Sequence, residues 1–255
     1  FAGWDMPVWY SSVSDEHRAV RESAGLFDVS HMGGFEVTGP HAIEFLDTVT
    51  SNYVHWLEDM DSCYSYLFDT DGNVIDDIMV YRISVERFLV VVNAANEDKD
   101  WDWMTAVNEG RVQIDKERPW IQPASKAELI NLKSDAAGER QLRGIALQGP
   151  MSKRILTACI EKSEDQGKLG KLRRTRLTEI VVDGYSVIVT RTGYTGEKMG
   201  YELYVHPDNL PALWNKLMET GKDSGIRPCG LAARDSLRIE AGLPLYGHEL
   251  AGTYN

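Results

Sequence analysis

Long apolar runs and cysteines are both scarce in this 255-residue chain. No stretch approaches the roughly 18 apolar residues that a membrane helix needs, and the N-terminus lacks the basic-then-apolar order of a signal sequence. The three cysteines, Cys63, Cys159 and Cys229, are too scattered for a disulfide framework and form no C-x-x-C pair. These features predict a soluble protein of a reducing compartment.

Positive charge is also in short supply. The chain has 27 Lys and Arg residues against 39 Asp and Glu residues, a net charge of −12, which disfavours binding to nucleic acid or to anionic membranes. The one basic segment, residues 168–176, is interleaved with leucines. We interpret it as a solvated loop and strand edge, with docking of an acidic partner as the alternative.

Several catalytic motifs are missing as well. The sequence has no G-x-G-x-x-G, no P-loop, no H-E-x-x-H and no G-x-S-x-G, so nucleotide hydrolysis, zinc proteolysis and α/β-hydrolase chemistry are poorly supported. The six histidines have no acidic or cysteine companions at ligand spacing. No metal site is predicted.

The patterns that are present predict an α+β fold. Ser14 is expected to cap a first helix that ends at Gly25, and Asn93–Asn96 to cap a later one. The polar residues 109–143 are expected to hold insertions and a domain seam. Strands are expected at 34–38, 143–148, 179–191 and 201–206 and, as an antiparallel meander, at 64–68, 74–83 and 88–92, with further helices after Pro40 and Pro150 and at 210–222 and 231–241.

Two adjacent carboxylates interrupt the apolar strand expected at 74–83. Because side chains alternate along a strand, Asp76 shares a face with Ile78, whereas Asp77 shares the other with Met79. Either both aspartates stay in solvent near the hairpin turn, or one of them lines a cleft.

The segment Arg191–Glu197 contains two glycines that permit unusual backbone angles. It is either an ordinary hairpin turn or a ligand-facing loop that presents Tyr194. Glu202 follows on the next strand and is either exposed or directed at the same ligand.

Two arginines lie four residues apart on the helix expected at 231–241. Like charges at this spacing are unfavourable unless anions pair with them. Either Asp235 pairs locally with Arg238, or Arg234 and Arg238 await a carboxylate-bearing ligand or a buried acidic partner.

Taken together and in order, nine segments resemble the aminomethyltransferase (T-protein) family of the glycine cleavage system. The matching segments are 3–7, 16–21, 25–32, 72–77, 91–96, 147–150, 191–197, 229–238 and 240–249. The resemblance implies transfer of a one-carbon unit from the aminomethyl group on lipoylated H-protein to tetrahydrofolate, with release of ammonia. It also implies a cytoplasmic protein, or one of the mitochondrial matrix in a eukaryote.

The same resemblance implies the tetrahydrofolate-binding T-protein fold, a cloverleaf of three α+β domains. Two of these are expected here: a discontinuous first domain of residues 1–50 with 144–240, and an inserted second domain of 51–143 with 241–255. The third, C-terminal domain is expected to be absent, because the residues after Glu249 leave the family pattern.

By motif, the family's key aspartate falls on Asp76. Folate-contacting positions fall on Tyr64, Tyr194, Glu202 and Arg234, with Met32 and Asn93 by weaker analogy. These residue types suit folate, whose pterin needs a carboxylate for its amino-pyrimidine edge and an aromatic slot for its ring, and whose glutamate tail needs cations. The stretch 196–200 is one residue longer than the family pattern, so the register of Glu202 stays open.

Two other functions remain possible from the sequence. One is a tetrahydrofolate-dependent N-, O- or S-demethylase of the same superfamily, which would keep the folate residues and change those that admit the donor. The other is a non-catalytic folate-binding module. The related iron–sulfur-assembly proteins carry a Lys-Gly-Cys-Tyr signature that is missing here, and the Ile75-Asp-Asp motif favours an enzyme.

Overall fold

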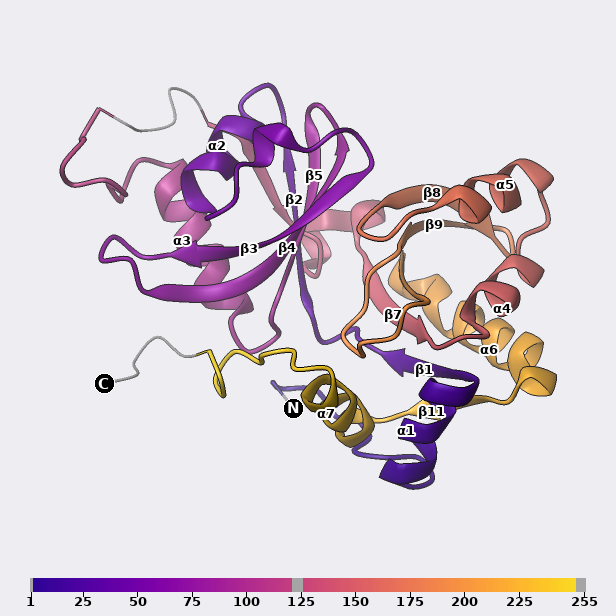
Figure 1. Ribbon diagram of the computed structural model, residues 1–255. Helices are drawn as coiled ribbons and strands as arrows, with labels where there is room; N and C mark the ends of the chain where they lie inside the picture. The colour runs from indigo at the N-terminus through magenta and orange to yellow at the C-terminus, as the bar shows by residue number, and fades with distance from the viewer. Residues whose placement is uncertain (1, 121–125, 251–255) are drawn as a thin grey trace. The chain divides into compact units, whose positions relative to one another are not determined.

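The computed structural model describes residues 2–120 and 126–250 (Figure 1). The chain forms two compact units: unit 1 is Phe1–His31 with Gln141–Pro244, and unit 2 is Met32–Arg140 with Leu245–Asn255. Residues 32–50, which the sequence grouped with the first domain, therefore belong to unit 2. The reason is hydrogen bonding, because the strand that opens this segment pairs on both sides with strands of unit 2.

Unit 1 is built on a six-stranded sheet in the order β11-β1-β7-β10-β9-β8. Only the β1–β11 pair among the described strands of this sheet is parallel. The strands are β1 (Ala24–Asp28), β7 (Arg143–Gln148), β8 (Leu177–Val182), β9 (Tyr185–Thr190), β10 (Gly200–Val205) and β11 (Ile226–Cys229). The helices are α1 (Val13–Glu22), α4 (Ser152–Ala158), α5 (Ser163–Lys171), α6 (Leu210–Gly221), α7 (Leu231–Glu240) and the short 3₁₀ turns η3 (Pro207–Asn209) and η4 (Lys222–Ser224).

Apolar residues of this sheet pack against α4, α5 and α6. Leu147 and Leu203 of the sheet share one buried cluster with Ile155, Leu169 and Leu213 of the three helices. Helices α1 and α7 pack against each other beside β1 and β11 (Figure 1). The central strands β1, β7 and β10 bury residues of both faces, whereas a helix such as α6 buries one face.

Unit 2 is built on a five-stranded antiparallel sheet in the order β3-β4-β5-β2-β6. Helices α2 and α3 supply Phe45 and Met104 to the core that also holds Phe35 and Val80 of the sheet. The expected meander of three strands is confirmed. The elements are β2 (Gly33–Thr38), α2 (Ala42–Val49), η1 (Val54–Trp56), β3 (Asp61–Phe68), β4 (Val74–Ser84), β5 (Arg87–Val92), α3 (Glu97–Asn108), β6 (Glu128–Asn131) and η2 (Asp135–Arg140).

Local details differ from expectation at several places. The hydroxyl of Ser12, not of Ser14, caps α1 by accepting from the Asp15 N–H. The single strand expected at 179–191 is the hairpin β8–β9, which turns at Asp183 and Gly184 with φ values of 50° and 83°. Asp-Gly is a known hairpin signal, so the turn was visible in the sequence.

Two further segments also differ. Helix α5 covers the start of the basic segment 168–176, which was expected to be a loop and strand edge. Strand β6 lies inside the segment 109–143, which was expected to hold insertions and a domain seam, because it pairs with β2 from Thr38 to Phe35. Residues 121–125 of that segment lie outside the described residues. In the described part of the chain, no helix is long and apolar enough to cross a membrane.

A buried carboxylate joins three segments of unit 1. Glu16 is 0% exposed, and its side chain accepts from the backbone N–H groups of Tyr10 (2.6 Å), Ser11 (2.8 Å) and Gly230 (2.8 Å). Gly230 precedes α7, and a Cβ there would come within 2.4 Å of the Val8 carbonyl oxygen. Glycine at this position therefore lets the N-terminal segment pass close to the start of α7.

Candidate functional site

Asp76 is a fully buried carboxylate on β4. Burial alternates along this strand, so Asp76 faces the core side with Ile78 while Asp77 lies half-buried on the other side. The oxygens of Asp76 accept three hydrogen bonds, from Asn93 N (2.9 Å), Asn93 Nδ2 (2.9 Å) and Asn96 Nδ2 (2.5 Å). Asp76 therefore does not remain in solvent, and its donor set suits an anion.

The two asparagines reach Asp76 because of the turn that follows β5. This strand runs antiparallel to β4 and ends at Val92, which places Asn93 beside the start of β4. Asn93 Nδ2 also donates to Oδ1 (2.8 Å) and to the carbonyl oxygen (3.1 Å) of Asp77, so one side chain bridges both aspartates. Asn96 stands at the N-cap position of α3 but makes no side-chain cap hydrogen bond. The expected capping role is wrong for Asn96, whose amide binds Asp76 instead.

Tyr64 lies on the other side of β4 from Asp76. It is 40% exposed on β3, and its hydroxyl donates to Asp77 Oδ2 at 2.9 Å. Burial raises the pKa of Asp77, and the Asp76 charge adds to this, while the hydrogen bonds from Tyr64 and Asn93 oppose it. Burial and the Asp77 carboxylate raise the pKa of Tyr64, so the phenol remains a neutral donor.

Two residues that the sequence did not single out adjoin this group. Lys99 Nζ donates to the Ile75 carbonyl oxygen at 2.6 Å and lies 4.5 Å from the ring centroid of Tyr246. Asp100 is completely buried on α3. Met32, which the family analogy suggested, is half-buried directly before β2. The sequence singled out Asn93–Asn96 only as a helix cap, so it did not predict the hydrogen bond from Asn96 to Asp76.

In unit 1, Glu202 lies on β10, opposite Ala146 on one side and Thr190 on the other. It is half-buried, and its Oε2 accepts from Thr192 Oγ1 at 2.5 Å. Thr192 Oγ1 also lies 2.6 Å from Thr190 Oγ1. Glu202 is therefore not simply exposed: it belongs to a polar group at the end of the hairpin that joins β9 and β10.

Tyr194 and Arg234 form a cation–π contact within unit 1, with the guanidinium carbon 4.9 Å from the ring centroid. The Tyr194 hydroxyl donates to the Pro244 carbonyl oxygen. Burial lowers the pKa of Arg234, while the charge of Glu202 opposes that shift. Glu202 and Tyr194 thus both act electrostatically on Arg234.

The neighbouring arginine of α7 behaves differently. Arg238 Nε donates to Asp235 Oδ1 at 2.9 Å, and Arg238 is 3% exposed. The local pairing that the sequence offered is confirmed for Arg238. Among the described residues, the guanidinium of Arg234 lies over the Tyr194 ring and makes no ion pair.

Gln148 supports the loop that carries Tyr194. Its amide donates to the carbonyl oxygens of Thr192 and Tyr201 (both 3.2 Å) and its oxygen accepts from Thr195 Oγ1 at 2.9 Å. A Cβ on Gly193 would come within 2.0 Å of the Gln148 oxygen. The glycine-containing loop is therefore closed over a buried amide that sequence inspection did not identify.

The family described as the GCVT N-terminal domain matches residues 1–255. The chain belongs to the GCVT N-terminal domain family. Proteins named aminomethyltransferase match it at 42% identity from Symbiobacterium thermophilum, over 100% of this chain and 63% of that protein, and at 42% from Lysinibacillus sphaericus, over 99% and 62%. This GCVT-family chain thus spans about three fifths of the length of the curated relatives it matches.

Solved structures agree with that membership. The crystal structure of glycine cleavage system aminomethyltransferase T from Bartonella henselae is 33% identical with a TM-score of 0.80, covering 99% of this chain and 60% of that one. Heterotetrameric sarcosine oxidase from Corynebacterium sp. U-96 is 12% identical with a TM-score of 0.52, covering 84% of this chain and 92% of that one. The sarcosine oxidase shares only the fold. The expected α+β T-protein fold is confirmed.

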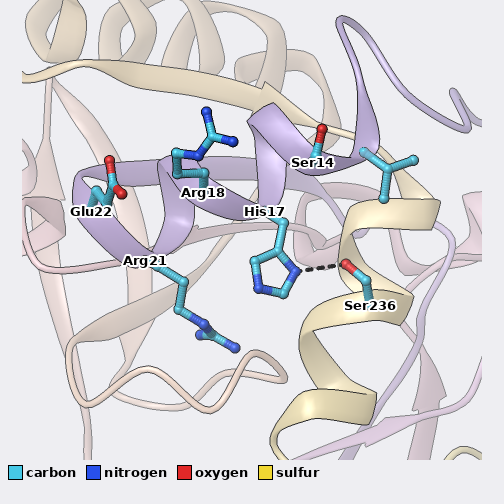
Figure 2. A pocket seen from close by; sticks show the side chains of 7 residues that line it. Ser14, His17, Arg18, Arg21, Glu22 and Ser236 are labelled. Atoms are coloured by element: carbon cyan, nitrogen blue, oxygen red, sulfur yellow. Dashed lines mark hydrogen bonds between the residues drawn. The ribbon is translucent and has the colours of Figure 1, made fainter.

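A separate open pocket of about 690 Å³ lies on unit 1, along α1 and Ser236 of α7 (Figure 2). His17 bridges the two helices there, with Nδ1 2.8 Å from Ser236 Oγ and Nε2 3.1 Å from Glu240 Oε2. Ser236 Oγ also lies 3.1 Å from the Ala233 carbonyl oxygen, so His17 Nδ1 and this carbonyl both adjoin one hydroxyl. The contacts of His17 join α1 to α7. None of the sequence-predicted site residues lines this pocket.

Proposed function

We propose that this protein is a tetrahydrofolate-dependent aminomethyltransferase of glycine cleavage. The observation that supports this best is the buried carboxylate of Asp76, held by three N–H donors in a chain whose family relatives are named aminomethyltransferase. The likeness to sarcosine oxidase carries only the fold, so it adds no weight to the demethylase alternative.

In the proposed reaction, the methylene carbon of S-aminomethyl-dihydrolipoyl H-protein passes to tetrahydrofolate. The carbon loses its bonds to sulfur and to the amino nitrogen and gains bonds to two folate nitrogens. The two folate N–H protons go to the departing thiol and to ammonia, so atoms and charge balance. Asp76 contributes by orienting the attacking amine and by stabilising positive charge that develops as ammonia leaves.

Folate contacts are proposed for the other predicted residues in each unit. Glu202, which already accepts from Thr192, is suited to accept from the amino-pyrimidine edge of the pterin. Arg234, with its charge over the Tyr194 ring, is suited to bind a carboxylate of the glutamate tail. The proposed contacts in unit 2 are Tyr64, Asn93 and Met32.

The test is an assay of ammonia and methylene-tetrahydrofolate with lipoylated H-protein carrying the aminomethyl group, run beside a panel of N-, O- and S-methyl donors. We expect turnover with H-protein and none with the methyl donors. The reverse result would identify a demethylase. Folate binding without turnover of any donor would identify a non-catalytic module.

The three cysteines are unpaired, and we place the reaction in a reducing compartment such as the cytoplasm.

A further inference from the structure

Asp100 is a buried acid that has no role in the proposed mechanism. It lies on α3, four residues after Asn96 and hence on the same side of the helix. Its side chain is 0% exposed, and among the described residues neither carboxyl oxygen receives a hydrogen bond. An ionised carboxylate in such a place would be strongly destabilising, because nothing replaces its lost hydration.

The charged groups that face Asp100 are Asp76 and Asp77 of β4 and Lys99 of its own helix. The two aspartates disfavour a negative charge on Asp100. Lys99 favours one, as does the N-terminal end of α3, but Lys99 Nζ is already bound to the Ile75 carbonyl oxygen. Burial and the aspartates outweigh both and raise the pKa of Asp100 to about 10.

Asp76 acts on Asp100 both through its charge and through a side-chain hydrogen bond. A hydrogen bond between two carboxyl groups needs one proton, because two carboxylates offer only acceptors to each other. Asp76 already accepts three N–H hydrogen bonds, an arrangement that suits its anionic form, whereas Asp100 accepts none. The proton therefore belongs on Asp100, whose hydroxyl then has Asp76 as its acceptor.

We propose that Asp100 is a positioning residue that stays protonated at neutral pH and donates a fourth hydrogen bond to the Asp76 carboxylate. The buried pair then carries a single negative charge, located on the residue that we assign to catalysis. In its effect on turnover this inference rests on the proposed function, whereas the protonation of Asp100 does not.

Infrared difference spectroscopy tests the protonation directly. At pH 7 we expect the carbonyl stretch of a protonated carboxylic acid in the wild type and in Asp76→Asn, and its loss in Asp100→Asn. The exposed Asp102→Asn on the same helix is the matched control and should leave the band unchanged. A wild-type spectrum in which Asp100→Asn removes no such band overturns the proposal, whatever reaction the protein catalyses.

Kinetics test the positioning role. Asp100→Asn keeps a donor of the same shape, so kcat should stay within about threefold, whereas Asp100→Leu should lower kcat by about tenfold or more with little change in the folate KM. Equal losses in the two variants, or a folate KM that changes along with kcat in Asp100→Leu, overturn the role. Absence of wild-type turnover would instead count against the proposed function.

Discussion

The side-chain amide of Asn96 donates to Oδ1 of Asp76 at 2.5 Å, and so joins the N-terminus of α3 to the buried face of β4. The two residues are 20 positions apart in the chain. The amide of Asn96 therefore binds Asp76, and its side chain makes no cap hydrogen bond to the first N–H groups of α3.

Replacing Asn96 should therefore affect both stability and activity. Asn96→Ala leaves a buried carboxylate oxygen short of one donor, and we expect a loss of about 1–3 kcal/mol in the free energy of unfolding. Urea denaturation measures this. Asn209 occupies the corresponding N-cap position of α6 without a side-chain cap hydrogen bond, so Asn209→Ala is the matched control and should change stability by under about 0.5 kcal/mol. Similar losses in both variants would show that the contact with Asp76 is unimportant.

The two aspartates of β4 should differ in their effect on turnover. Asp76→Asn is expected to lower kcat by about a hundredfold or more while folate still binds, because a positioned anion is lost but the shape is kept. Asp77→Asn should cost less, since Asp77 is on the other side of the strand with Tyr64. Steady-state kinetics and calorimetric folate titration measure the two effects. A larger kcat loss in Asp77→Asn would reverse the assignment.

Arg234 should affect the tail of folate more than its pterin. Arg234→Ala is expected to weaken binding of polyglutamated tetrahydrofolate by about 1–3 kcal/mol, because a charge-assisted hydrogen bond is lost. Pterin fragments without the tail should lose less. The exposed Arg174→Ala provides a control for the change in net charge. If tailed and tailless ligands are weakened equally, Arg234 has no role in binding the tail.

Stability should depend on pH through Asp100. Its folded-state pKa, about 10, lies far above the value of about 4 for an unfolded Asp, so the unfolded chain releases this proton first as pH rises. The contribution of Asp100 to stability is present below pH 4 and is lost progressively between pH 4 and 10. Asp100→Asn removes this dependence. Its free energy of unfolding relative to the wild type should rise by about 2–4 kcal/mol from pH 5 to pH 8. A difference that is flat with pH would contradict the raised pKa.

Glu16 should be among the most sensitive positions of unit 1. Glu16→Ala leaves the N–H groups of Tyr10, Ser11 and Gly230 without their acceptor, and we expect a loss of about 3–5 kcal/mol in unfolding free energy. Glu22→Ala, at an exposed position of the same helix, should cost under about 0.5 kcal/mol. Thermal or urea unfolding compares them. A small effect of Glu16→Ala would mean that water satisfies these N–H groups.

Local patterns in the chain were sufficient for most of the helices and strands and for the opposite facing of Asp76 and Asp77. Alternation along a strand is a property of the backbone itself, so it can be read without knowing what lies on either side. The same patterns missed the β8–β9 turn at Asp183 and the pairing of β6 with β2. The first error overlooked a visible Asp-Gly signal, and the second arose because a four-residue strand has too little periodicity to be recognised.

The partners of the buried polar groups depended on tertiary structure. Asn96 and Glu16 each carry a side chain with ordinary local uses, a helix cap or an exposed first-turn acid, and only the packed chain shows that their acceptors and donors are remote. Asp100 directly follows Lys99 in α3, yet it is fully buried beside Asp76. Burial and long-range hydrogen bonds involve residues far apart in the chain, and they determine which of several carboxyl groups holds a charge and which holds a proton.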